Sequence, residues 1–232
     1  MQTVDIDYIF KFKDKKEKHV HVCLNSQTLD LIAEIPEKLP TWTNLYFHQC
    51  PNCLLSTQTS PKCPVAVHLV KLIESFEHLQ SYDIILVEIM TSERITFDET
   101  STQKGLSSLI GLIMATCGCP HTVFFRPMAR FHLPFANAFE TTFRAVSMYL
   151  VAQYFRRKQG LDADLELEGL KKIYSNIQLI NIAMAERLRA ITDKDAALNA
   201  LVILDSFAQF VPFSIDESLH EIRHLFTSYL IQ

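Results

Sequence analysis

The apolar residues change their spacing once along the chain, near residue 100, and this change limits the possible folds more than any other feature. Residues 5–12 and 19–24 alternate polar and apolar side chains, which predicts two β-strands joined by a hairpin at the charged residues 13–18. Further strands are predicted at 28–32, 82–90 and 94–97. From residue 102 onward the apolar residues recur at helical spacing.

Five helices are predicted beyond residue 100 and one before it. The earlier helix covers 64–79, where Pro64 suits a first turn. The later ones are a short helix at 106–116, a helix ended by Gly160, a helix over 170–188, and helices at 194–210 and 215–230 separated by Pro212. The predicted buried stripe of the second of these five is Phe139, Phe143, Val146, Leu150 and Tyr154.

Strands followed by helices predict the α+β class. We expect residues 1–100 to form a mostly antiparallel sheet with one helix and a cysteine-bearing loop at 48–64. Residues 101–232 should form a helical bundle that shares the same core. A chain of 232 residues can bury a core of this size.

The composition of the chain limits the kinds of partner that we expect it to bind. Lys and Arg number 22 against 26 Asp and Glu, so the basic excess typical of nucleic-acid binders is missing. Residues 1–12 lack the apolar core of a signal peptide, and the apolar run at 109–115 is too short to span a bilayer. We therefore expect a soluble cytoplasmic protein whose partner is a small molecule or a protein, in an oligomeric state that the sequence leaves open.

Three cysteines lie close together in the sequence as Cys50-Pro-Asn-Cys53 and, nine residues later, Cys63. A C-x-x-C turn directs two thiolates at one point, and Cys63 precedes a predicted helix start that favours its thiolate. These cysteines therefore predict a metal site. Cys119 is the preferred fourth ligand, because it completes a four-cysteine set and precedes a proline, as iron–sulfur ligands often do.

Other fourth ligands and other roles remain open from the sequence. His48 and His121 are the reserve ligands, followed by Cys117 and His68. Zinc in a structural role is the favoured metal, and a [4Fe-4S] cluster in an enzyme or redox sensor is the alternative. A C-P-x-C redox dithiol is disfavoured because the polar loop 56–61 follows where a helix would be needed. The remaining possibility is an interaction protein without a functional metal.

The segment from Cys119 to Pro134 suggests a second site. His121, Arg126, Arg130 and His132 lie there among aromatic residues, which would suit an anion or substrate pocket beside the metal. The alternative is that both arginines pair with acidic residues while Phe124, Phe125 and Phe131 fill the core.

Two further features are less informative. His220-Glu-Ile-Arg-His224 matches the zinc-protease motif H-E-x-x-H, but both histidines should face solvent, so no catalytic residue is assigned and enzymatic activity is left open. Asn181 falls within an apolar helical stripe, where it is either a satisfied core amide or a pocket group.

Four segments carry a family resemblance: His48–Cys53, Cys63–Ala66, Gly118–Thr122 and Phe125–Pro134. With these segments the chain resembles an uncharacterised family of bacterial cytoplasmic proteins. The resemblance implies a bacterial protein without an assigned activity, and it contributes no catalytic residue.

Overall fold

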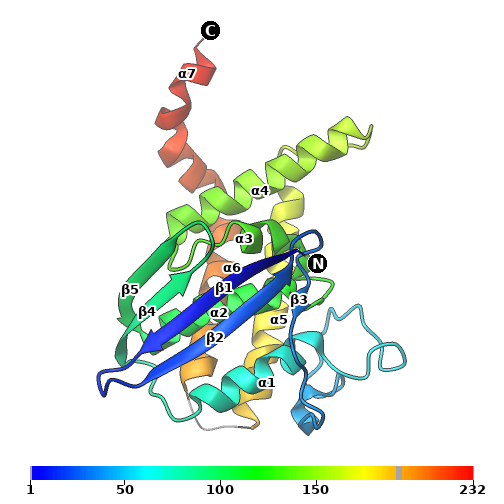
Figure 1. The fold of residues 1–232 in the computed structure, drawn as a ribbon. Coiled ribbons are helices and arrows are strands. Elements are labelled where there is room, and N and C mark those ends of the chain that lie inside the picture. The colour runs from blue at the N-terminus through cyan, green and yellow to red at the C-terminus, as the bar shows by residue number, and fades with distance from the viewer. Residues whose placement is uncertain (1, 192–194, 232) are drawn as a thin grey trace.

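The computed structural model describes residues 2–191 and 195–231, and it shows one antiparallel sheet with helices packed against one of its faces (Figure 1). The strand order is β3-β2-β1-β4-β5. The strands are β1 Thr3–Lys11, β2 Glu17–Asn25, β3 Leu31–Ile32, β4 Ile84–Met90 and β5 Ile95–Ser101. The predicted α+β class is confirmed.

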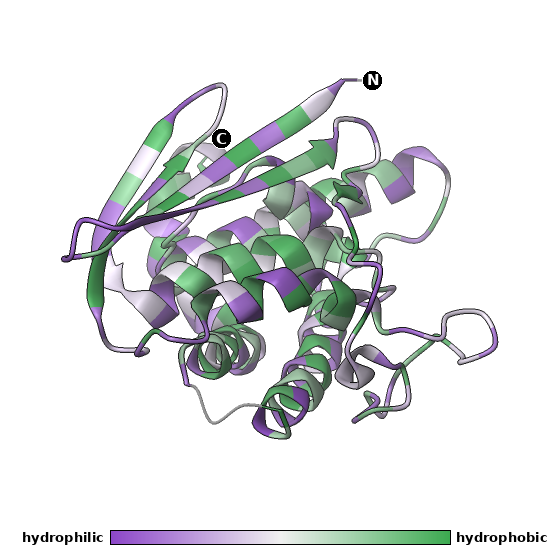
Figure 2. Ribbon diagram, turned by 60° about the horizontal axis from the view of Figure 1, so that its bottom comes forward, coloured by the Kyte–Doolittle hydropathy of each residue, from purple (hydrophilic) through white to green (hydrophobic). Residues whose placement is uncertain are grey.

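Alternation along β1 separates the two faces of the sheet. Ile6, Tyr8 and Phe10 are buried against the helices, whereas Asp5 and Asp7 point to the open face. Figure 2 shows the helical layer on one side of the strands and no element on the other. The sheet therefore contributes one apolar face to the core.

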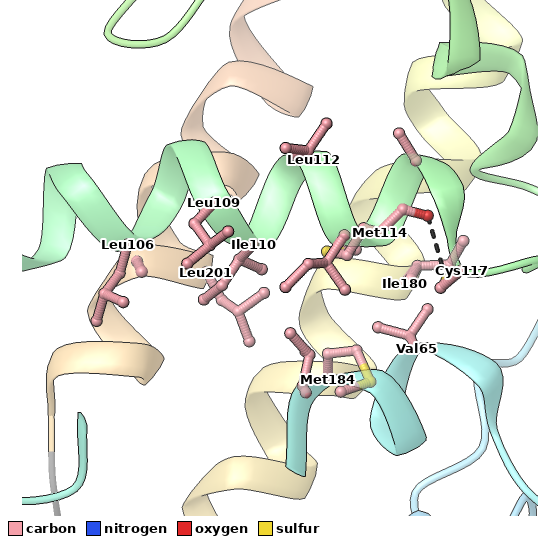
Figure 3. Close-up of a cluster of buried hydrophobic side chains, with 14 of the residues drawn as sticks. Val65, Leu106, Leu109, Ile110, Leu112, Met114, Cys117, Ile180, Met184 and Leu201 are labelled. Atoms are coloured by element: carbon pink, nitrogen blue, oxygen red, sulfur yellow. Dashed lines mark hydrogen bonds between the residues drawn. The ribbon is translucent and has the colours of Figure 1, made fainter. Parts of the chain in front are cut away.

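Helix α2 (Thr102–Thr116) begins directly after β5 and lies beneath the sheet (Figure 1). Its buried residues meet side chains of three other helices: Val65 of α1 (Pro64–Phe76), Ile180 and Met184 of α5 (Glu168–Arg189), and Leu201 of α6 (Ala196–Ile222) (Figure 3). The remaining helices are α3 Arg126–Arg130, α4 Ala138–Lys158 and α7 Thr227–Leu230. One core thus joins residues on both sides of position 100.

The predicted break at Pro212 is wrong, because α6 continues through this residue. Proline removes a single backbone donor, and the buried side chains of Ala208, Val211 and Ile215 keep the flanking turns packed on the core. Beyond Ile222 the chain is largely exposed: Phe226 is 40% exposed and Tyr229 is 80% exposed.

The predicted buried stripe of α4 is correct only at Val146. Phe139, Phe143 and Tyr154 are each more than two-fifths exposed, and besides Val146 the helix buries Thr142, Ala145, Tyr149 and Gln153. Two of the buried polar groups bind the segment before α5, since the Tyr149 hydroxyl donates to the Asp164 carboxylate at 2.8 Å and Gln153 accepts from the Asp164 N–H at 3.0 Å. These polar contacts fix a face that apolar spacing does not reveal.

A helical stretch that covers α6 and the residues after it is apolar as well as long. Residues Ala196–Leu230 are long and apolar enough to cross a membrane by length and composition, with a third of the most apolar window buried. Helix α6, which makes up most of this stretch, packs against α2, α4 and α5. A core helix passes the same test, so the stretch does not assign a location.

Candidate functional site

The structure brings the four predicted thiol ligands to one small cavity. Cys50 and Cys53 lie in the loop before α1, Cys63 immediately precedes α1, and Cys119 follows α2. Together they line a cavity of about 20 Å³ whose opposite wall is formed by Ile180 and Met184 of α5. Residues separated by up to 69 positions in the sequence thus share one site.

Backbone hydrogen bonds hold each cysteine segment in place. The Cys53 N–H donates to the Cys50 carbonyl at 3.0 Å, which closes the C-x-x-C turn, and the Cys63 N–H donates to the Thr43 carbonyl at 2.8 Å. The backbone N–H groups of His121 and Thr122 act on the Cys119 sulfur and lower its pKa against the larger, opposing effect of burial. A turn that directs N–H donors at a sulfur favours its thiolate form.

The thiols influence one another electrostatically. Burial, together with the neighbouring charges of Cys63, Cys53 and Cys119, raises the pKa of Cys50 to about 12. Like charges that crowd one buried space disfavour ionisation, and a divalent cation among them reverses this effect by displacing the protons. The group is therefore suited to a cation.

Arg187 lies beside these thiols and is 1% exposed. Its guanidinium donates to the carbonyl oxygens of Trp42, Asn44 and Leu45 at 2.6–2.9 Å. Within residues 2–191 and 195–231 it forms no ion pair with a carboxylate. Burial lowers the Arg187 pKa, whereas negative charge on Cys63, Cys50 and Cys53 would raise it. The thiol cluster is thus the closest source of compensating charge.

The reserve ligands are placed less favourably than Cys119. His48 does not line the cavity, and its side chain is 41% exposed near Glu186. His121 lines the cavity, but its Nε2 lies 2.6 Å from the Asn52 carbonyl oxygen. Cys117 is buried outside the cavity and donates to the Met114 carbonyl at 3.3 Å (Figure 3).

A tighter group of potential ligand atoms lies on the open face of the sheet. Across the described part of the chain, only Asp5, His21 and Cys23 place one ligand atom each within 4.8 Å of one another, so the four cavity sulfurs are spread more widely. Strand register pairs Asp5 with Cys23. Cys23, which is half-buried, belongs to this cluster together with the exposed Asp5 and His21. His21 already contacts Asp7 at 2.7 Å and Asp5 at 3.2 Å.

The structure does not bring the residues of the second predicted site together in one pocket. Arg126 pairs with Asp30 and Arg130 with Glu93, while His121 belongs to the cysteine cavity. Of the three phenylalanines, Phe125 packs on Tyr174, but Phe124 and Phe131 are 52% and 73% exposed. The alternative interpretation of this segment is therefore correct for the two arginines, which pair with acidic residues. For the phenylalanines it is correct only at Phe125, because Phe124 and Phe131 do not fill the core.

His132 alone of these four residues reaches a second, much larger cavity of about 490 Å³. Helices α2, α3, α4, α5 and α6 surround this cavity. Arg144, Tyr174 and Asn181 also line it. Arg144 and Tyr174 were missed in the sequence, because neither carries a local motif and their convergence depends on how α4 packs near α5.

The H-E-x-x-H motif does not form a ligand pair on one helix. His220 lies in the last turn of α6 and His224 in the following 3₁₀ turn, where its Nδ1 is 2.9 Å from the Glu221 carbonyl oxygen. Both histidines are exposed, as expected.

Comparison with known proteins gives a family but no activity. The family model described as "Domain of unknown function (DUF6901)" matches residues 6–227. No curated protein and no solved structure matches the chain. The expected resemblance to an uncharacterised family is confirmed at this level, whereas a bacterial origin stays a prediction.

Proposed function

The chain belongs to the DUF6901 family, and from the cysteine cavity we propose that it is a metal-binding protein in which Cys50, Cys53, Cys63 and Cys119 hold a structural zinc ion. Four thiolates and no open position are typical of structural rather than catalytic zinc. Closure of the sulfurs around zinc, at about 2.3 Å each, would draw together a cavity that they already share.

The buried guanidinium of Arg187 is the observation that carries this proposal. Four thiolates around a divalent cation leave two negative charges, and an ion in a protein interior is costly unless a partner compensates it. Arg187 supplies a buried positive charge next to Cys50, Cys53 and Cys63, and no carboxylate in the described residues neutralises it. The negative charge of the zinc–thiolate group and the positive charge of Arg187 would compensate each other.

The metal would stabilise the fold by joining three separate segments. No disulfide joins the loop at Cys50–Cys53, the start of α1 and the segment after α2, whose cysteines are free thiols, and all three segments meet α5 at this cavity. Because such a site does not exist in the unfolded chain, binding free energy becomes folding free energy. A reducing compartment such as the cytoplasm suits thiolate ligands, and we expect the protein to act there.

Metal analysis of the purified protein tests the proposal. We expect stoichiometric zinc, lost in Cys50→Ser, Cys53→Ser, Cys63→Ser and Cys119→Ser together with a lower melting temperature. Cys117→Ala is the matched control, because this thiol is buried nearby but outside the cavity. Cys23→Ser shows whether any metal belongs to the open face of the sheet.

The outcomes separate the alternatives. A brown protein with stoichiometric iron would replace zinc by a [4Fe-4S] cluster at the same ligands. Arg187→Met should weaken metal binding, and breaking a buried charge pair of this kind costs about 3–5 kcal/mol. Full metal content in the combined Cys50, Cys53 and Cys63 variant would disprove the site, and purified protein without any metal would favour a role in protein interaction.

A further inference from the structure

From the larger cavity we propose a second function: it binds a small organic carboxylate with an apolar body, held by Arg144, Tyr174 and Asn181. Its volume of about 490 Å³ lies within the range of about 300–1,000 Å³ found for small-molecule sites. Most of its wall is apolar, with side chains such as Leu112, Phe207 and Ile177. This proposal does not depend on the metal site.

Asn181 gives the clearest sign of a ligand. It is 2% exposed and lines the cavity, yet neither its Oδ1 nor its Nδ2 has a hydrogen-bond partner among the described residues. An unsatisfied buried amide costs folding free energy, so a ligand that pairs with it would offset this cost. A bound polar group would satisfy it.

Tyr174 presents a second polar group on the same face of α5, seven residues before Asn181. Its side chain is 4% exposed, and its hydroxyl forms no hydrogen bond within residues 2–191 and 195–231. The hydroxyl is held neutral, because burial raises the Tyr174 pKa. It is therefore a hydrogen-bond donor available to an acceptor in the cavity.

Arg144 on α4 gives the site its charge preference. The guanidinium donates to the carbonyl oxygens of Met128, Phe131 and Leu133 at 3.0–3.3 Å, which uses three of the five N–H donors of an arginine. In the described part of the chain no carboxylate lies in ion-pair contact with it; Glu140, one turn earlier on α4, acts on it only at longer range. Two remaining donors and a net positive charge match a carboxylate.

The three polar groups together select the ligand class. They supply an amide, a hydroxyl and a cation at a cavity whose wall is mostly apolar, so a ligand with one anionic end and a hydrocarbon body satisfies both parts. Lys104, which is exposed and also lines the cavity, marks a side that is open to solvent. A highly charged phosphate compound would leave the apolar wall unused.

Calorimetric titration of the intact protein with decanoate, kept below its micelle concentration, tests the proposal. We expect saturable binding with one site per chain, and weaker binding of the uncharged 1-decanol. Tyr174→Phe and Asn181→Leu should each reduce decanoate affinity about fivefold to tenfold, the loss of one net hydrogen bond. Ala208→Leu, which adds carbon atoms to the cavity wall, should abolish binding.

Asn181→Leu also has a readout that a merely structural amide would not give. Removal of an unsatisfied buried amide should raise the melting temperature of the ligand-free protein by about 2 °C or more while it weakens decanoate binding. Gln178→Leu is the control, since it also replaces an amide side chain of α5 by leucine, lies outside the cavity and should leave the affinity unchanged. Absence of saturable decanoate binding, equal binding of 1-decanol, or full affinity in Asn181→Leu and Ala208→Leu would overturn the proposal.

Discussion

His132 links the sheet to the helical layer through a part-buried hydrogen bond. Its Nε2 lies 2.5 Å from the hydroxyl of Tyr8, a fully buried residue of β1. Burial, and to a smaller extent the charge of Arg144, lower the His132 pKa from its usual 6.5 to about 4. The imidazole is therefore neutral in the folded protein over the physiological range of pH.

This lowered pKa predicts how stability depends on pH. Above pH 6.5 the imidazole is neutral in both the folded and the unfolded chain, so it has no effect. Between pH 6.5 and pH 4 only the unfolded chain takes up the proton, and His132 then costs up to about 3 kcal/mol of unfolding free energy. We expect His132→Gln to lose less stability than the wild type between pH 7 and pH 4.5 in urea unfolding.

Any loss of metal at low pH should affect the wild type and His132→Gln equally, because both contain the cysteine cavity. The difference between their unfolding free energies therefore reports on His132. His220→Gln is the control, because His220 is exposed and its replacement should leave the pH dependence as in the wild type. Parallel stability curves for the wild type and His132→Gln would contradict the prediction.

Single residues also show how far sequence reasoning reaches. Cys50, Cys53 and Cys63 could be predicted as a group because their spacing is local, and Cys119 because it completes a ligand set. Arg187 and Arg144 could not be predicted, because each acts on residues that are far away in the sequence and come close only in the folded protein. An arginine at the spacing of Met184 and Leu188 on an apolar face is the signal that could have revealed Arg187.

Among the elements, α2 has the closest approach to the sheet, and glycine makes it possible. A Cβ added at Gly105 would lie 2.9 Å from Cγ2 of Val87 and 3.3 Å from Cε1 of Phe10. Both side chains are fully buried, so neither can move away without disturbing the core. The helix would have to shift away from the sheet.

Gly105→Ala should therefore destabilise the protein, although alanine is favoured over glycine within a helix by about 1 kcal/mol. We expect a net loss of up to about 2 kcal/mol in chemical unfolding, because overpacking costs about 1–3 kcal/mol and alanine regains only about 1 kcal/mol of it. Gly111→Ala on the same helix is the control: its closest contact, Cδ2 of Leu204 at 3.3 Å, is the end of a side chain at the larger cavity, which has room to move. Equal or higher stability of Gly105→Ala would contradict this packing.

Helices and strands could be predicted where the burial of apolar residues alone decides which face points inward. The strands followed from alternation because the sheet buries one face only, and their predicted ends differ from the observed ones by a few residues. For α4 the spacing of apolar residues was misleading, because Tyr149 and Gln153 are held inward by Asp164 while Phe139 and Phe143 remain outside. At Pro212 as well, tertiary packing outweighed a local signal, because the buried side chains around it keep α6 continuous despite the helix-breaking tendency of proline.

At the scale of the whole molecule the two cavities share their walls. Helix α5 presents Ile180 and Met184 to the cysteine cavity and Ile177 and Asn181 to the larger one. The segment after α2 does the same, with Cys119 and His121 on one side and Thr122 on the other. Metal at the cysteines would thus fix two walls of the ligand site.

Metal removal should accordingly weaken ligand binding as well as stability. We expect both the chelator-treated wild type and the untreated Cys50→Ser, Cys53→Ser double variant to melt at a lower temperature. Both should bind decanoate less tightly than the metal-loaded protein, because ordering the shared walls must then be driven by the ligand itself. The two metal-free samples should agree with each other, which excludes a direct effect of the chelator. A lower melting temperature with unchanged decanoate affinity would show that the two sites are independent.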